Sequence, residues 1–282
     1  MKPAPPITPM LEHTLWHPVA LSQAVGAQAQ AATLLGEELV LWRDDAGVAQ
    51  AWRDQCPHRG ARLSLGRVVG GELECPYHGW RFAAGGRCTH MPAAPDFQPG
   101  PRHGAHGFAA QEACGMLWVR LAEPEGPLLP IHALPRFAAE DEPRLRKTTS
   151  GPYVVAASAP RIIENFLDMA HFGFVHEGWL GSREHSAIDN HHEAIAMFVC
   201  PVTEESSVVW TRMAMNDFDS PDARLIEFQD HIFGQDRPVL ESQRPKRLPL
   251  APDAEAHGAA DRLSTAYRRY LRQAGIRFGV IA

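Results

Sequence analysis

The sequence of 282 residues contains no run of 18 apolar residues, so we expect no membrane-spanning helix. Its net charge of −6 gives no excess of basic side chains, which argues against a general nucleic-acid-binding protein. Segment 1–9 lacks the apolar core of a secretory signal, so we expect a cytoplasmic protein. The chain also lacks a G-x-G-x-x-G motif that opens a helix after a strand, so it has no recognisable site for NADH.

Cysteine is scarce, with five residues, an odd number. Cys88, Cys114 and Cys200 have no partner suggested by the sequence, so we expect buried free thiols in a reducing compartment. The composition is 45% hydrophobic and 21% charged, as in an ordinary globular protein. The length predicts one to two domains.

Two short segments each offer one thiolate and one imidazole. C-P-H-R-G begins at Cys56 and carries His58, and C-P-Y-H-G-W begins at Cys75 and carries His78, with sixteen residues between His58 and Cys75. Two Cys and two His, divided evenly between two loops, suit a Rieske [2Fe–2S] cluster, in which two Cys hold one iron and two His hold the other. A structural zinc site is the alternative, although zinc sites more often use C-x₂₋₄-C and H-x₃₋₅-H spacings.

The first part of the chain has the pattern of an all-β domain. A hairpin is predicted from strands 38–43 and 48–53 around the turn 44–47. Further short strands are predicted at 72–74, 80–82 and 116–121. We assign a first domain to residues 10–122 and a linker rich in proline to 123–150.

The second domain, 151–282, has a mixed pattern, which makes the whole chain α+β. Strands are predicted at 153–157, 194–199 and 207–213, and helices at Pro160–Gly173, from about Asp222, and at Ala260–Ala274. On the last helix, Arg268 and Arg269 are expected to face solvent. His185, His191 and His192, followed by Glu193, are expected in a solvated loop.

The helix after Pro160 carries a second set of candidate metal ligands. Asn165, Asp168 and His171 are three residues apart, so they should project from nearly one face of the helix. His176 follows after Gly173, where the chain can bend. Two histidines and one distant carboxylate would form the facial triad of a non-haem Fe(II) oxygenase, which leaves positions open for O₂.

Together, C-x-H…C-x-x-H followed by N-x-x-D-x-x-H-x₄-H resembles the large subunit of a Rieske non-haem iron oxygenase. The similarity extends over nearly the whole chain, and segment 162–172 resembles the vanillate O-demethylase-like monooxygenase branch in particular. The resemblance implies a Rieske domain followed by a helix-grip catalytic domain, an antiparallel sheet with helices. It also implies two cofactors, the [2Fe–2S] cluster and a mononuclear Fe(II).

The resemblance further implies roles for single residues. The iron would be held by His171, His176 and a carboxylate nearer the carboxyl terminus. Segment 233–243 matches the family there, which makes Asp236 the third ligand, with Asp230 and Glu227 as alternatives. Asp168, and Asn165 beside it, would belong to the catalytic site. Asp168 would bridge a cluster histidine of one subunit to His171 of its neighbour in a homotrimer.

The activity implied is that of a terminal oxygenase. It would use O₂ and electrons from a separate NAD(P)H-dependent reductase or ferredoxin to hydroxylate or O-demethylate a small, aromatic substrate, as a monooxygenase or dioxygenase. Two other function classes remain open: an electron-transfer protein with a degenerate second domain, and a zinc-stabilised binding module.

One departure from the family pattern concerns the pocket. Only 59 residues lie between His176 and Asp236, fewer than the family usually places there. After the helix that leads to Asp236, the rest could hold three or four strands, but we identify only two. The missing part should fall near residues 191–198, so the sheet is expected to be shortened where relatives build pocket walls.

Overall fold

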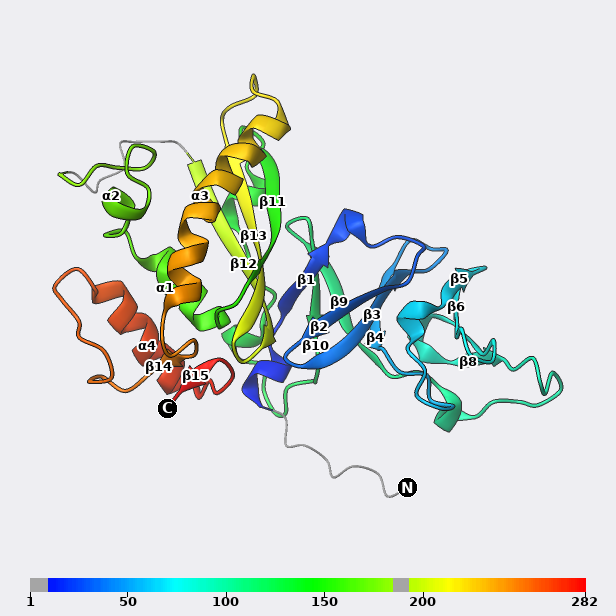
Figure 1. The fold of residues 1–282 in the computed structure, drawn as a ribbon. Helices are drawn as coiled ribbons and strands as arrows, with labels where there is room; N and C mark the ends of the chain where they lie inside the picture. Colours follow the sequence, from blue (N-terminus) through cyan, green and yellow to red (C-terminus); the bar gives the residue numbers. More distant parts are fainter. Residues whose placement is uncertain (1–9, 185–192) are drawn as a thin grey trace. The chain divides into compact units, whose positions relative to one another are not determined.

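The computed structural model describes residues 10–184 and 193–282 (Figure 1). The chain forms two compact units. The first comprises residues 13–134, and the second comprises residues 135–282 together with 10–12. Among the described residues, no helix is both long and apolar enough to cross a bilayer.

The first unit is built on two antiparallel sheets. The larger has six strands in the order β1-β10-β9-β4-β3-β2, with bounds β1 His17–Leu21, β2 Gln30–Leu34, β3 Glu37–Arg43, β4 Ala49–Arg53, β9 Gly107–Ala113 and β10 Met116–Arg120. The smaller has four strands in the order β5-β6-β7-β8, with bounds β5 Arg67–Val69, β6 Glu72–Glu74, β7 Arg81–Phe82 and β8 Cys88–His90. Single 3₁₀ turns of this unit lie at Ser22–Ala24, Leu63–Leu65, Ala84–Gly86, Pro101–His103 and Pro130–His132; the turn Leu11–Thr14 spans the boundary between the units, and Ala138–Asp141 lies in the second unit.

The predicted hairpin is confirmed as β3 and β4, which pair in register from Leu39 opposite Arg53 to Arg43 opposite Ala49. The predicted strands at 72–74, 80–82 and 116–121 are confirmed as β6, β7 and β10 to within a residue at each end. Strands β1, β2, β5, β8 and β9 were not predicted. Several are short or carry little apolar alternation, so their formation depends on pairing with neighbours.

The core of the first unit lies directly beneath the two cysteine segments. Trp42 and Trp52 are fully buried, with their rings edge to face and 5.0 Å between centroids. Burying each such ring stabilises the fold by roughly 2–3 kcal/mol. Cys56 and Cys75 belong to the same buried cluster, so the packing that stabilises the domain also fixes the positions of both thiols.

The second unit contains a three-stranded antiparallel sheet in the order β11-β13-β12, with bounds β11 Arg146–Val155, β12 Glu193–Thr203 and β13 Ser206–Met215. Strand β11 begins seven residues before the strand predicted at 153–157. Between His176 and Asp236 the described residues form only the two strands identified in the sequence, β12 and β13. A short parallel pair, β14 Leu248–Pro249 and β15 Val280–Ile281, lies near the carboxyl end.

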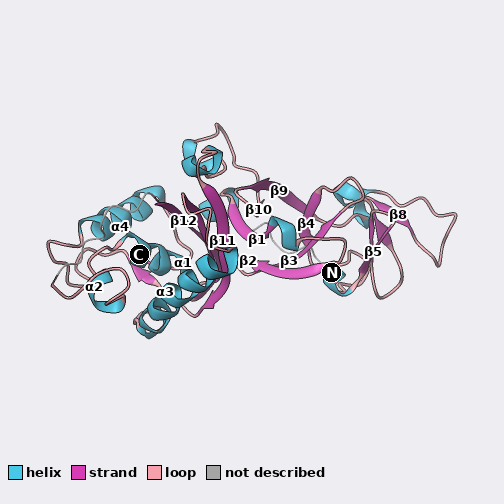
Figure 2. Cartoon of the chain, turned by 90° about the horizontal axis from the view of Figure 1, so that it is seen from above, coloured by secondary structure: helices cyan, strands magenta, loops and turns pink. Residues whose placement is uncertain are grey.

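In the described part of this unit, four helices accompany the sheet: α1 Ala159–Leu167, α2 Phe172–Val175, α3 Asp222–Ser242 and α4 Arg262–Ala274. Figure 2 shows α1, α3 and α4 gathered on one side of strands β11 and β12. Phe233 on α3 is buried and stacks on Tyr153 of β11, with ring centroids 4.3 Å apart. This packing holds the middle of α3 against the sheet, three residues before Asp236.

The helix after Pro160 is shorter than predicted. Helix α1 begins one residue earlier, at Ala159, where the Ser158 hydroxyl accepts a hydrogen bond from the Arg161 N–H. It ends at Leu167, because Asp168 adopts an extended backbone and its carboxylate accepts the N–H of Ala170. The expectation that Asp168 and His171 share a helix face was therefore wrong, since both lie beyond the end of α1.

The expectation that Arg268 faces solvent was also wrong. Arg268 on α4 is 6% exposed and donates two hydrogen bonds to Glu164 of α1, at 2.5 and 2.8 Å. It also donates to Glu255 at 2.5 Å, and Arg161 donates to the same carboxylate at 2.5 Å. Arg269 is exposed as expected. Two arginines and two glutamates thus form a balanced network that joins α1 to α4.

The three cysteines outside the two ligand segments differ in exposure. Cys88 and Cys200 are buried, as predicted, whereas Cys114 is only half-buried and has a positive φ of 52°. It lies at the turn between β9 and β10, where the tight connection keeps its side chain nearer the surface. The histidines at 185, 191 and 192 lie outside the described residues.

Candidate metal centres

The two cysteine segments of the first unit are closed by the same pair of backbone hydrogen bonds. In the first, the N–H of Cys56 donates to the carbonyl of Ala61 at 2.8 Å, and the N–H of Gly60 donates to the carbonyl of Cys56 at 2.9 Å. In the second, the N–H of Cys75 donates to the carbonyl five residues later at 2.8 Å, and the N–H four residues later donates to the carbonyl of Cys75 at 3.1 Å. Two loops of equal shape therefore present equivalent cysteines.

A glycine with positive φ lets each loop turn. Gly60 has φ +75° and Gly79 has φ +69°, a region that residues with a Cβ rarely adopt. A Cβ added at Gly79 would also lie 3.0 Å from the ring of Pro92. The glycine four residues after each cysteine is thus required by the backbone, and at Gly79 also by close packing.

The side chains of the four predicted cluster ligands form two distinct pairs. Cys56 and Cys75 are each 2% exposed, whereas His58 is exposed and His78 is half-buried. The two imidazole rings lie 4.6 Å apart. Burial raises the pKa of the Cys56 thiol to about 12, and the neighbouring Cys75 adds to the effect. A thiolate at this site therefore needs a bound cation, which suits a metal cluster.

Trp80 orients one of these imidazoles, a role that the motif alone did not predict. Its indole stacks on the ring of His58 with centroids 4.4 Å apart and an angle of only 4° between the planes. A flat stack of this kind restricts rotation of an otherwise exposed side chain. The second ligand segment thus supports a ligand of the first.

The arrangement of donors separates a cluster from a single zinc ion. Among residues 10–184 and 193–282, only His171, His176 and Asp236 bring three or more metal-binding side chains within 4.8 Å of one another. A tetrahedral zinc would require Cys56, Cys75, His58 and His78 to converge around one point. A buried cysteine pair and a more exposed histidine pair instead suit the two ends of a [2Fe–2S] cluster.

In the second unit, three side chains from distant parts of the sequence meet. Nε2 of His171 lies 3.4 Å from Oδ1 of Asp236, and Nε2 of His176 lies 3.2 Å from the same oxygen. His171 and His176 flank the short helix α2, while Asp236 lies in the second half of α3. The bend that the sequence predicted at Gly173 is made by α2 itself, which turns the two imidazoles toward α3.

The chemistry of these three residues fits a divalent cation. Oδ1 of Asp236 is buried and makes no hydrogen bond with any described residue, although two imidazole nitrogens lie close to it. Burial alone would raise the pKa of Asp236, but His171 and His176 outweigh it and lower that pKa below its ordinary value. A buried carboxylate oxygen aimed at two ring nitrogens is the donor set of a 2-His-1-carboxylate iron site.

Each imidazole has a hydrogen-bond partner on its other nitrogen. Nδ1 of His171 lies 3.2 Å from Oδ2 of Asp168, and Nδ1 of His176 lies 2.8 Å from Oε1 of Gln235. Such partners fix which nitrogen carries the proton and therefore which one is free to bind a metal. Sequence reasoning identified Asp168 but missed Gln235, because it lies 59 positions after His176 and no spacing rule connects them.

Other candidates named from the sequence lie apart from this site. Asp230 accepts a hydrogen bond from the Tyr153 hydroxyl at 2.5 Å, and Glu227 is exposed. Asn165 is half-buried; its backbone carbonyl accepts the N–H of Asp168, and no side-chain hydrogen bond is found for it within the described part of the chain. Its catalytic role stays a prediction.

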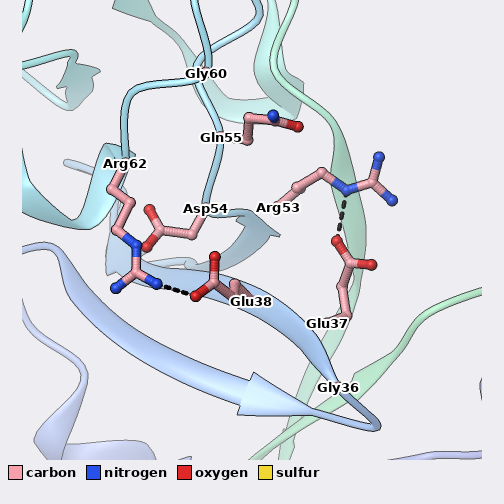
Figure 3. Close-up of a pocket in the computed structure, with 8 residues that line it drawn as sticks. All are labelled: Gly36, Glu37, Glu38, Arg53, Asp54, Gln55, Gly60 and Arg62. Atoms are coloured by element: carbon pink, nitrogen blue, oxygen red, sulfur yellow. Dashed lines mark hydrogen bonds and ion pairs between the residues drawn. The ribbon is translucent and has the colours of Figure 1, made fainter.

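A polar cleft of about 520 Å³ lies in the first unit (Figure 3). Its walls carry two ion pairs, Glu37 with Arg53 and Glu38 with Arg62. Gln55, directly before the first ligand loop, and Gly60, the last residue of that loop, also line it. The charged walls do not suit an apolar ring, so this cleft is no candidate for a pocket that binds an aromatic substrate.

Comparison with family models assigns both halves of the chain. Residues 15–101 match the Rieske [2Fe–2S] domain. Residues 155–195 and 192–276 match the vanillate O-demethylase oxygenase C-terminal domain as two segments. The two matched segments meet at 192–195, where the sequence was expected to lack part of the sheet.

Similar proteins extend over most of the chain. Methylxanthine N1-demethylase NdmA of Pseudomonas putida is 31% identical, with 92% of this chain and 88% of that protein covered. The solved structure of NdmA superimposes with a TM-score of 0.81 at 29% identity, covering 93% of each chain. The alignment with NdmA runs over 318 positions, more than the 282 residues of this chain, so part of the relative has no counterpart here.

Two further relatives match smaller parts. Dicamba O-demethylase, oxygenase component, of Stenotrophomonas maltophilia is 33% identical over 57% of this chain and 46% of that protein. Oxidoreductase NdmD of Pseudomonas putida is 42% identical over 118 residues, which cover 41% of this chain and 20% of that protein. The relatives thus include N- and O-demethylases and one oxidoreductase.

Proposed function

Because the chain belongs to the Rieske non-haem iron oxygenases, as a large subunit of the vanillate O-demethylase-like branch, we propose that it removes methyl groups from a small N-methyl or O-methyl aromatic compound. It is a terminal oxygenase component, which uses O₂ and electrons supplied by a reductase. The observation that carries the proposal is the convergence of His171, His176 and Asp236 in a chain that is similar along its length to a methylxanthine demethylase.

The reaction balances with the components named. A substrate R–X–CH₃, in which X is nitrogen or oxygen, reacts with O₂, two electrons and two protons to give R–XH, formaldehyde and water. One oxygen atom enters the methyl C–H bond and the other leaves as water. The resulting hydroxymethyl group releases formaldehyde when the X–C bond breaks.

The cofactors supply the redox chemistry: when bound, the cluster passes single electrons and the mononuclear iron activates O₂. The residues of the protein would hold and orient these two cofactors. Cys56, Cys75, His58 and His78 would bind the cluster, and His171, His176 and Asp236 would bind the iron. We propose that the carboxylate of Asp168 accepts a hydrogen bond from the N–H at Nδ1 of His171. Nε2 of that ring then carries no proton and is free to face the metal.

Phe172 supports the choice of an aromatic substrate. Its ring lies edge to face with His171 at 4.9 Å and with His176 at 5.7 Å. It thus provides an apolar surface directly beside both proposed ligands. Such a surface favours a planar, apolar ring over a charged or flexible molecule.

We further propose how electrons arrive. They would come from a separate NAD(P)H-dependent reductase or ferredoxin, because the chain contains no recognisable motif for a nicotinamide cofactor. The assembly would be a homotrimer, in which Asp168 of one subunit accepts a hydrogen bond from a cluster histidine of the next. A cytoplasmic location remains our prediction.

The alternative of a Rieske electron-transfer protein with a degenerate second domain has less support. All three residues that would bind the iron are retained with a geometry that fits a cation, and the relatives that match most of the chain are demethylases. A vestigial domain would have no reason to keep a buried, hydrogen-bond-free carboxylate oxygen between two imidazoles.

The test combines metal content with product formation. Anaerobically purified protein should hold about three irons per chain, two in the cluster and one in the triad. With a reductase, NADH and a panel of N-methylpurines and methoxybenzoates, the protein should release formaldehyde and consume O₂. In His171→Ala, turnover should disappear while the electron paramagnetic resonance signal of the reduced cluster persists. An unchanged turnover rate in that variant would reject the proposal.

A further inference from the structure

We infer that Gln235 is a positioning residue for the proposed iron ligand His176, with His231 and Trp179 holding its amide in place. The inference rests on the proposed function, because it concerns how the triad accepts iron. His176 is 1% exposed, and its Nδ1 lies 2.8 Å from Oε1 of Gln235. This is the shortest hydrogen bond that either proposed histidine ligand makes through its ring.

The position of the proton on His176 decides whether it can bind a metal. Nε2, which faces Asp236 at 3.2 Å, can bind only if it carries a lone pair, so the proton must then reside on Nδ1. The carbonyl oxygen of Gln235 accepts that proton. If the amide were reversed, its N–H₂ group would face Nδ1 and favour the tautomer in which Nε2 is blocked. The orientation of one amide thus selects the competent form of His176.

The amide orientation is itself fixed by a second histidine. Nε2 of Gln235 lies 3.2 Å from Nε2 of His231, one turn earlier on α3. An amide nitrogen only donates, so the ring nitrogen of His231 acts as the acceptor. With the amide N–H engaged there, the carbonyl oxygen is directed to His176.

Trp179 contacts both His231 and the backbone of His176, and so links the two ends of this set of interactions. Its indole lies 4.2 Å from the ring of His231, and its backbone N–H donates to the carbonyl of His176 at 2.9 Å. The path therefore runs from the His176 ring to Gln235, to His231, to Trp179 and back to the His176 backbone. Both the ring and the backbone of the ligand are tied to the same turn of α3.

Direct measurement of metal binding tests this role independently of turnover. Anaerobic Fe(II) affinity is measured by competition with a chelator in the full-length protein, and Co(II), which does not change oxidation state here, reports coordination through its visible spectrum. Gln235→Leu keeps the side-chain size but loses both hydrogen bonds. We expect its Fe(II) affinity to fall by roughly 10–100-fold, the usual cost of removing such a partner. The cluster absorption serves as the internal standard for folding.

Three further variants separate positioning from packing. Gln235→Glu retains an acceptor for Nδ1, so it should bind Fe(II) within a few-fold of wild type. Gln229→Leu makes the same change one and a half turns earlier on α3, where the side chain makes no hydrogen bond to a described residue, and should leave the affinity unchanged. His231→Phe keeps a ring beside Trp179 but removes the acceptor, so it should show an intermediate loss.

Each outcome has a defined meaning. Wild-type affinity in Gln235→Leu, an equal loss in Gln235→Glu, or an equal loss in Gln229→Leu would overturn the inference and leave the proposed function standing. Wild-type affinity in His231→Phe would overturn the part assigned to His231. If wild type and His171→Ala bound Fe(II) equally, the proposed iron site itself would be rejected.

Discussion

The carboxylate of Asp168 lies between the end of helix α1 and the ring of His171. Oδ1 accepts the N–H of Ala170 at 2.8 Å, while Oδ2 lies 3.2 Å from Nδ1 of His171. One side chain therefore ends the helix and orients the ligand that follows. Because the two tasks use different oxygens, they can be separated by substitution.

We expect Asp168→Asn to reduce product formation by roughly 10–100-fold. The amide oxygen can still accept the N–H of Ala170 and end α1. Its N–H₂ group then faces Nδ1 of His171, where it can only donate, and the side chain carries no charge toward the proposed path from the cluster. Steady-state formaldehyde release measures the effect, with iron and cluster content determined on the same sample. Asp219→Asn, at an exposed position, is the control. A rate equal to wild type would contradict the role assigned to Asp168.

Removing the buried guanidinium of Arg268 should strongly destabilise the second unit. In Arg268→Met the carboxylate of Glu164, 8% exposed, loses both of its hydrogen bonds from α4. Arg161, 3.7 Å from this carboxylate, would be its one remaining cation among the described residues. Removing one partner from a buried ion pair costs about 3–5 kcal/mol, and we expect a loss near the lower end of this range. Chemical denaturation followed by circular dichroism measures the change. Arg269→Met, at the adjacent exposed position, should change the free energy of unfolding by less than about 0.5 kcal/mol.

The same network predicts a loss of stability in acid. Burial would raise the pKa of Glu255, but Arg161 and Arg268 outweigh it and lower that pKa from 4.5 to about 2. A lowered pKa means that the stabilisation is complete above pH 4.5 and is lost as the pH falls toward 2. Thermal unfolding of wild type and Glu255→Gln should therefore differ most above pH 4.5 and converge near pH 2. A constant difference across this range would contradict the prediction.

Gly79 should be needed for a correctly formed second ligand loop. An alanine there would have to adopt φ +69° and place its Cβ 3.0 Å from Pro92, at a cost of about 1–3 kcal/mol. We expect Gly79→Ala to lower both the midpoint of unfolding and the cluster absorption per chain. Gly26→Ala, which meets open space and has no positive φ, should leave both unchanged.

The sequence was most informative where structure is local. The hairpin of β3 and β4 is specified by two short apolar segments around a four-residue turn, and the cysteine loops by Cys, His and Gly at fixed spacing. The comparisons confirm the family that these loops and the segment 165–176 indicated. The three strands of the second sheet were also located, although their ends were not.

Contacts between residues far apart in the chain could not be predicted from the sequence. Arg268 was assigned to solvent because it forms a pair of adjacent arginines with Arg269, and nothing local shows that Glu164, 104 residues away, provides its counter-charge. The pairing of Gln235 with His176 was missed for the same reason. The early end of α1 depends on the hydrogen bond from the Ala170 N–H to the side chain of Asp168, which competes with the helical hydrogen bonds. The spacing of apolar residues does not reveal such a bond.

Pro238 lies inside α3, two residues beyond Asp236. Its ring has no N–H, so the carbonyl of Gly234 receives no helical hydrogen bond from that position. The turns before and after the proline are thereby partly uncoupled, and the end of α3 can open without disturbing the turn that carries Asp236. In amide hydrogen exchange, we therefore expect the segment after Pro238 to exchange sooner than the turns that precede it, as a separate cooperative unit.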